Sequence, residues 1–223
     1  MTNPAPPSGS HQEHVSLSSA GERYRARLQQ RSLSSVLQQR VTDKERETLS
    51  VALDRVLEDN SAIILAGIVV AARRRFVAGT GKSFAYATLL ARDLSGGLAE
   101  VFLVDNNIIR SVEILRETKP TDVLVVFSLR RYRRDTIELC EQFIAAGGTV
   151  VAITDAEDSP VTALAAASIV VPTDSVSYAD SPTAIAAIIH LVTTLSTASA
   201  KGAKRRLAER DRISNELGIY LQD

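Results

Sequence analysis

Residues 79–83 are the stretch whose residue types are best suited to bind an anion. The sequence Gly79-Thr80-Gly81-Lys82-Ser83 follows a short strand-like run and precedes a helix-like stretch over 84–94. Glycine permits a sharp turn and a close approach of the backbone to a ligand, and the first turn of a helix presents unpaired N–H groups. With a serine hydroxyl and a lysine ammonium nearby, the turn is a candidate phosphate-binding site. The alternative is an ordinary tight turn between a strand and a helix.

Two nucleotide-binding motifs resemble this stretch and are excluded by single residues. A Walker A loop requires a small residue where Phe76 stands, five places before Gly81-Lys82-Ser83. A dinucleotide-binding fingerprint requires a third glycine where Phe84 stands. We therefore expect neither a bound nucleotide nor any other cofactor.

A second candidate site is the arginine-rich run Ser128-Leu129-Arg130-Arg131-Tyr132-Arg133-Arg134. Its arginines stand just before a predicted helix, where the helix macrodipole disfavours cations. A bound phosphate would offset this unfavourable placement, and planar guanidinium groups suit phosphate well. The alternative is a solvated charged loop.

Alternating strand and helix patterns position both candidate sites. The strand-like runs are short, apolar and β-branched, as in parallel strands covered on both faces. This alternation predicts a doubly wound α/β fold with a five-stranded parallel sheet of order 2-1-3-4-5, whose ligand lies at the carboxyl ends of the first and third strands. We expect strands at 75–79, 99–104, 122–127, 149–154 and 168–172, and helices at 83–95, 107–117, 135–146, 160–166 and 182–198.

The residues before the first strand predict an arm and two leading helices. Residues 1–20 have the composition of a disordered segment. Residues 21–40 can form a basic helix that either touches nucleic acid or packs on a partner. A capping box from Thr42 to Glu45 predicts a helix start there. We expect an arm over 1–41, a core domain over 42–200 and a helical tail over 201–223.

Composition excludes several classes of protein. The chain has 223 residues, of which 45% are hydrophobic, and its 26 basic residues balance 26 acidic ones. That balance gives no general attraction to nucleic acid or anionic membranes. The single cysteine, Cys140, and the lack of a long apolar run predict a cytoplasmic protein without a membrane span. Three scattered histidines do not suggest a zinc site.

Residues 42–200 resemble a SIS (sugar isomerase) domain, in particular the ligand-binding half of RpiR-type transcriptional regulators. The resemblance is carried by GTGKS at 79–83, VFSLRRYRRDTIELCEQFIAAGGTVVAITD at 126–155 and DSPVTALAAASIVVPT at 158–173. It implies that Ser83 contacts a phosphosugar. In the third loop only Ser128 keeps a serine of the family's Ser-x-Ser-Gly-x-Thr pattern, and arginines replace the other three residues of that pattern. Some regulator-type members carry a similar Ser-x-x-Arg-Tyr variant.

The resemblance and the residues together predict a homodimer that binds a sugar phosphate or an amino-sugar phosphate and senses it. No helix-turn-helix precedes residue 42, so we expect a stand-alone domain without sequence-specific DNA binding. The alternative is an aldose–ketose isomerase, for which His190 is a weak candidate base. The predicted ligand-binding residues are Gly79, Thr80, Gly81, Lys82, Ser83, Ser128, Arg130, Tyr132 and Arg133.

Overall fold

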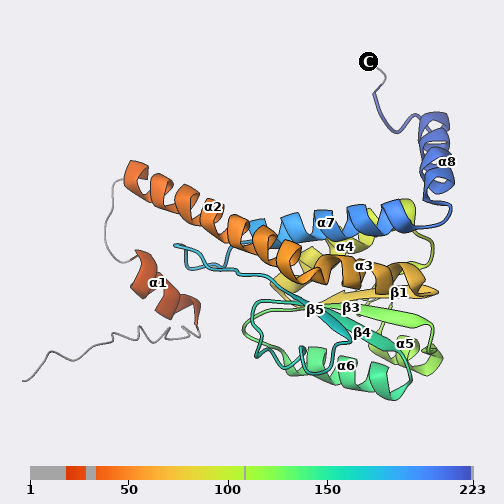
Figure 1. The fold of residues 1–223 in the computed structure, drawn as a ribbon, viewed down its shortest axis with the longest axis horizontal. Helices are drawn as coiled ribbons and strands as arrows, with labels where there is room; N and C mark the ends of the chain where they lie inside the picture. The colour runs from red at the N-terminus through yellow and green to blue at the C-terminus, as the bar shows by residue number, and fades with distance from the viewer. Residues whose placement is uncertain (1–18, 29–33, 108, 222–223) are drawn as a thin grey trace, which may run out of the picture.

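The computed structural model describes residues 19–28, 34–107 and 109–221. Helices and strands alternate along most of this length (Figure 1). The predicted disorder of residues 1–20 falls almost wholly outside the described residues. The elements are α1 Ala20–Leu28, α2 Ser34–Asp59, α3 Ser61–Ala71, β1 Arg74–Gly79, α4 Lys82–Gly97, β2 Val101–Leu103, α5 Ser111–Glu117, β3 Asp122–Ser128, α6 Arg134–Ala145, β4 Thr149–Thr154, β5 Ala167–Val170, α7 Thr183–Ser199 and α8 Ala203–Glu216.

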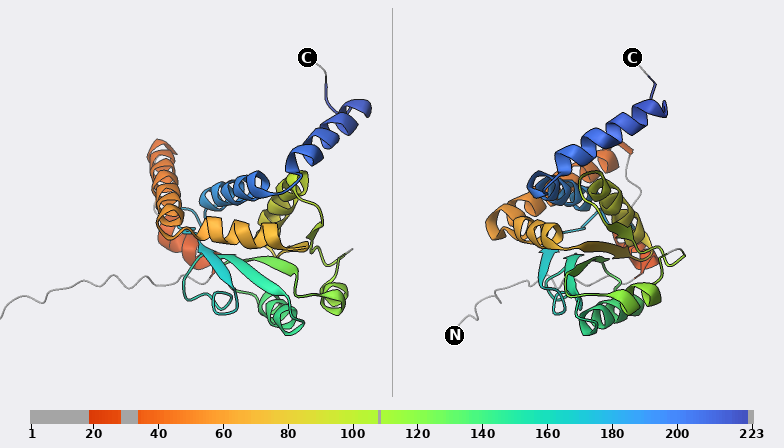
Figure 2. Two further views of the ribbon diagram at one scale, coloured as in Figure 1. Left: turned by 45° about the vertical axis from the view of Figure 1, so that its right-hand side comes forward. Right: turned by 90° about the vertical axis from the view of Figure 1, so that its right-hand side faces the viewer.

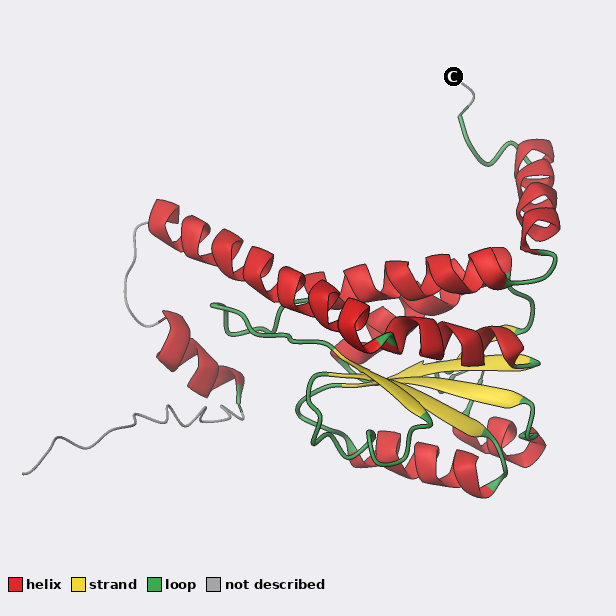
Figure 3. Ribbon diagram, in the orientation of Figure 1, coloured by secondary structure: helices red, strands yellow, loops and turns green. Residues whose placement is uncertain are grey.

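The five strands form one parallel sheet of order β2-β1-β3-β4-β5, which confirms the predicted fold class and strand order. Helices α3, α4 and α7 cover one face of the sheet, and α5 and α6 cover the other (Figure 3). The order places β1 beside β3, so the loops that follow these two strands lie next to each other. Both candidate sites are in those loops.

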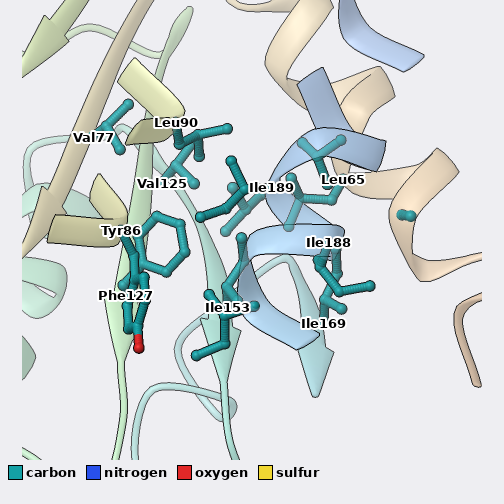
Figure 4. Packing of buried hydrophobic residues seen from close by; sticks show 14 of the residues in the cluster. Leu65, Val77, Tyr86, Leu90, Val125, Phe127, Ile153, Ile169, Ile188 and Ile189 are labelled. Atoms are coloured by element: carbon teal, nitrogen blue, oxygen red, sulfur yellow. The ribbon is translucent and has the colours of Figure 1, made fainter. Parts of the chain in front are cut away.

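Alternating side chains of the strands fill two separate cores. In β3, Val125 and Phe127 pack against α4 and α7, whereas Leu124 and Val126 pack toward α5 and α6. The first core also receives Ile188 and other apolar residues of α7 (Figure 4). Burial of β3 on both faces explains its unbroken apolar sequence.

Two buried arginine interactions hold the amino ends of the strands. Arg75 is 8% exposed, and its guanidinium donates hydrogen bonds to carbonyls at the end of α3, including those of Val69 (2.7 Å) and Val70 (2.9 Å), and to that of Ala99 (2.9 Å). Arg74 lies 2.6 Å from the carboxylate of Asp122, which is 1% exposed. Each interaction satisfies polar groups that burial would otherwise leave without partners.

Two local predictions are wrong. Residues 160–166 form turns rather than a helix. Helix α2 begins at Ser34, so Thr42 is inside it and donates its hydroxyl hydrogen to the carbonyl of Gln38 (2.9 Å) instead of capping a helix start. This hydrogen bond within the helix competes with the cap that the sequence suggested. The division into segments 1–41, 42–200 and 201–223 stays a prediction.

Helices α2 and α8 extend away from the sheet (Figures 1 and 2). In the described part of the chain no single helix is long and apolar enough to cross a membrane. Helices α7 and α8 taken together reach the required length and composition, but the chain bends by 106° between them.

Candidate functional site

A cavity of about 470 Å³ opens at the carboxyl ends of β1 and β3, where the prediction placed the ligand. Its volume is in the range of small-molecule sites. The lining comes from four parts of the chain: α1, the turn after β1 with the start of α4, the loop after β3 and the segment that leads to α7. The lining residues are Ala20, Arg23, Thr80, Gly81, Lys82, Ser83, Tyr86, Leu129, Arg130, Arg131, Tyr132, Arg133, Thr173, Tyr178, Ala179, Asp180 and Ser181.

Two glycines determine the shape of the turn after β1. A Cβ atom on Gly79 would lie 2.5 Å from the carbonyl oxygen of Ser83, which is too close for any side chain. Gly81 has a φ of 60°, a conformation that glycine adopts without strain. The amides of Ser83 and Phe84 donate to the carbonyls of Thr80 and Gly81, each at 3.2 Å. These two amides are therefore already engaged within the turn.

Four hydroxyl-bearing residues surround a smaller pocket of about 30 Å³ that shares part of its lining with the main cavity. They are Thr80, Ser83, Ser128 and Thr136. The hydroxyls of Thr80 and Thr136 lie 3.1 Å apart and hydrogen-bond to each other. Ser128 is 4% exposed, and its Oγ has no hydrogen-bond partner among the described residues. A buried hydroxyl without a partner is costly to stability, and one that lines a pocket can hydrogen-bond a ligand or a water there.

Carboxylates nearby engage two of the three arginines that line the cavity from the loop after β3. Arg130 lies 4.0 Å from Asp155 and 3.8 Å from Asp158. Arg133 lies 2.6 Å from Asp135, and its hydrogen bond is the main reason that the pKa of Asp135 is lowered.

Arg131 differs from these two arginines. It is exposed and lines both the main cavity and the smaller pocket. Within the described residues, no carboxylate or carbonyl oxygen pairs with its guanidinium. It is therefore the loop arginine that remains available to an anion.

Two tyrosines contribute neutral hydroxyls to the cavity. Burial, with a smaller effect from Asp180, raises the pKa of Tyr86 to about 12. The Tyr132 hydroxyl donates to Asp155 at 3.0 Å, and its pKa is raised, chiefly by burial. Since Asp155 also accepts a hydrogen bond from the Arg130 amide at 3.3 Å, both of its oxygens are engaged. The loop after β3 is thus held to the end of β4.

The segment between β5 and α7 covers the cavity from the opposite side. The Lys82 ammonium donates to the carbonyl of Asp180. The Ser181 hydroxyl donates to Glu45 of α2 at 2.5 Å and accepts the amide of Thr183 at 3.1 Å. No local sequence pattern indicates this role, because the contacts of this segment with Lys82 and Glu45 join residues far apart in the chain. Arg23, Tyr86, Arg131, Tyr178, Asp180 and Ser181 are lining residues absent from the predicted set.

The structure brings most predicted ligand-binding residues together. Seven of the nine line the main cavity, Ser128 lines the adjoining small pocket, and Gly79 lies beneath the turn. His190 is elsewhere: it is exposed on α7 and lines a separate groove with Arg92 and other residues of α4 and α8. Over the described ranges, no three His, Cys, Asp or Glu residues gather where they could hold a metal ion.

Solved structures share this fold. The sugar isomerase domain of an RpiR transcription factor from Sphaerobacter thermophilus is similar with a TM-score of 0.73 and 24% identity, over 79% of this chain and 98% of that one. NanR of Vibrio vulnificus, solved in complex with ManNAc-6P, has a TM-score of 0.65 and 14% identity, over 79% and 69%. A phosphoheptose isomerase from Francisella tularensis has a TM-score of 0.58 and 12% identity, over 74% and 97%.

No curated protein sequence matches the chain significantly. The model of the SIS domain family, however, matches residues 68–200, more than half of the chain. That range contains all nine predicted ligand-binding residues, and its sheet has the predicted order. The chain belongs to the SIS domain family.

Proposed function

We propose that this protein binds a sugar phosphate or an amino-sugar phosphate in the cavity between β1 and β3, and that it senses this ligand rather than converting it. The observation that carries the proposal is that the buried hydroxyl of Ser128, which has no partner among the described residues, lines the same small pocket as Arg131. A phosphate oxygen accepts hydrogen bonds from both kinds of donor. Ser83 and Thr80 add hydroxyls to the same place.

The charges around the cavity favour an anionic ligand. Arg130 and Arg133 have carboxylate partners, whereas Lys82 hydrogen-bonds a carbonyl oxygen and Arg131 has no partner in the described part of the chain. A phosphate monoester carries about two negative charges at neutral pH and would neutralise these two cations. A neutral sugar would leave them uncompensated.

A thermal-shift and calorimetric screen tests this proposal. The panel contains ManNAc-6P, glucosamine 6-phosphate and sedoheptulose 7-phosphate, each paired with its unphosphorylated sugar. A ligand at 100 times its dissociation constant should add about 2.7 kcal/mol to the free energy of unfolding. Arg131→Ala should reduce the affinity about tenfold, and Arg134→Ala, at the start of α6 and outside the cavity lining, should leave it unchanged. Equal stabilisation by phosphorylated and free sugars would contradict the proposal.

The second candidate function is aldose–ketose isomerisation, as in the phosphoheptose isomerase that shares the fold. The observation in its favour is that Asp180 brings a carboxylate into the cavity lining, since proton transfer between adjacent carbons requires a base. Asp180 lies 3.8 Å from Arg27, however, so its carboxylate is already engaged in an ion pair. His190 of the same chain lies outside the cavity lining. Sensing is therefore the function that these residues support better.

We also propose that the protein acts in the cytoplasm as a homodimer. Its single cysteine, Cys140, is buried as a free thiol, which fits a reducing compartment. Helices α2 and α3 expose large apolar side chains, among them Leu57 (76%), Ile63 (59%) and Ile64 (52%). Such a group of exposed apolar side chains is typical of an interface.

A further inference from the structure

Helix α1 forms part of the cavity wall, although it precedes the SIS-family match in the sequence. Ala20 and Arg23 are among the lining residues. Arg23 donates from Nε to the carbonyl of Tyr178 at 2.7 Å, and Arg27 donates to the carbonyl of Ser177 at 3.0 Å. No residue of α1 is buried. The helix is therefore held on the protein by polar contacts at its surface rather than by a core.

The spacing of its arginines gives α1 two different faces. Arg23 and Arg27 are four residues apart, so they project from the same side of the helix. Both are half-buried against the segment that leads from β5 to α7, whereas Arg25 between them is exposed. Figure 1 shows α1 next to this segment. Arg25 is thus an internal control, because it has the same side chain on the same helix.

The cavity lining next to α1 carries more positive than negative charge. Arg23 joins Lys82, Arg130, Arg131 and Arg133 in this lining, whose one carboxylate among the described residues, that of Asp180, lies 3.8 Å from Arg27 of α1. A phosphate ester bound among these side chains would be attracted by the excess of cations, Arg23 among them. The ring of Tyr178, which is 52% exposed and lines the same cavity, offers an apolar face on which a sugar ring can pack.

From these contacts we infer that α1 is a ligand-stabilised cap: a bound sugar phosphate is contacted by Arg23 and holds α1 and residues 173–181 over the cavity. This inference rests on the proposed function. The same segment also contacts α2, through the Ser181 hydroxyl and Glu45. Ligand occupancy is thereby linked to both amino-terminal helices. Because such coupling is reciprocal, a helix that the ligand stabilises must itself increase the affinity for the ligand.

The test compares Arg23→Ala and Arg25→Ala with the unmodified protein. The probes are inorganic phosphate and the three sugar phosphates named above, with affinity measured by calorimetry. Hydrogen–deuterium exchange of residues 20–28 is measured with and without the tightest of these probes. We expect Arg23→Ala to weaken binding about tenfold and Arg25→Ala to change it less than twofold. Binding should slow exchange in α1 of the unmodified protein and of Arg25→Ala, but not of Arg23→Ala.

The outcomes separate the cap from the site beneath it. If Arg23→Ala binds as tightly as the unmodified protein and exchange in α1 does not respond to ligand, the cap is refuted. The proposed function then stands, provided that Arg131→Ala still weakens binding. If none of the probes binds the unmodified protein, the proposed function and the cap are both overturned. Equal losses from Arg23→Ala and Arg25→Ala would also overturn the cap, because a general charge effect would explain them.

Discussion

Replacing Ser128 with alanine should have opposite effects on the free protein and on ligand binding. The Ser128 side chain is 4% exposed, and its hydroxyl lacks a hydrogen-bond partner in the part of the chain that the structure describes. Alanine removes this buried polar group, which we expect to raise the free energy of unfolding by about 1 kcal/mol. For a chain of this length that gain corresponds to a rise in Tm of about 2–4 °C.

The same substitution should weaken the binding of a sugar phosphate. A hydrogen bond to a charged group contributes about 1.5–3 kcal/mol, so the affinity should fall at least about tenfold. At a concentration of 100 times the original Kd, the stabilisation by ligand should then fall from about 2.7 to about 1.4 kcal/mol. The variant should therefore melt at a higher temperature than the unmodified protein without ligand, and at a similar temperature with ligand.

A matched control is available in α7. Ser196 is also buried, at 0% exposure, and its hydroxyl likewise has no partner among the described residues, but it does not line the cavity. Ser196→Ala should raise the stability of the free protein to a similar degree and leave the gain from ligand unchanged. Differential scanning fluorimetry with and without ManNAc-6P measures both effects. A loss of stability in free Ser128→Ala, or an unchanged gain from ligand, would refute this reasoning.

Four further predictions follow from the structure. Asp122→Asn should lower the free energy of unfolding, measured by urea titration, by about 2 kcal/mol near pH 7. Burial raises the pKa of Asp122, but the hydrogen bonds from Arg74 and an amide outweigh burial and lower this pKa, so the loss of stability should shrink as the pH falls below about 4. Gly79→Ala should lower stability by about 1–3 kcal/mol in the same titrations, because its Cβ would lie 2.5 Å from a carbonyl oxygen. Light scattering should give twice the 24.1 kDa chain mass, and Ile64→Asp should give the single-chain mass. Incubation with ManNAc-6P in deuterated water should leave the sugar's carbon-bound hydrogens unexchanged; rapid exchange that His190→Ala abolishes would show an isomerase.

The parallel sheet was predictable because its strands are short apolar runs that alternate with helix-like stretches. Val123 to Phe127 are five consecutive apolar residues, all at most 1% exposed, and such a run is typical of a central parallel strand. Where local signals compete, prediction failed. Residues 160–166 form turns instead of the predicted helix, and the hydroxyl of Thr42 bonds back within α2 instead of capping it.

The candidate site was predictable in part for a similar reason. The turn at 79–83 and the loop after β3 carry their own sequence signals. Which of the loop arginines is available was not predictable, because it depends on the positions of Asp135, Asp155 and Asp158 around them. The contribution of Arg23 was not predictable either, since its partner Tyr178 is 155 residues away in the sequence. Sequence patterns report local structure, whereas these contacts depend on the folded chain.

The buried guanidinium of Arg75 has a consequence for redesigning the protein. Its hydrogen bonds join the end of α3 to the segment before β2, at the amino ends of the strands, while the cavity lies at their carboxyl ends. Residues 129–133 and 173–180 can therefore be randomised in a library without touching the hydrogen bonds of Arg75. Ser181 is kept, because its hydroxyl joins this segment to Glu45 of α2. Position 75 itself must be kept fixed in such a library, because lysine lacks the planar fork that bonds several carbonyls at once.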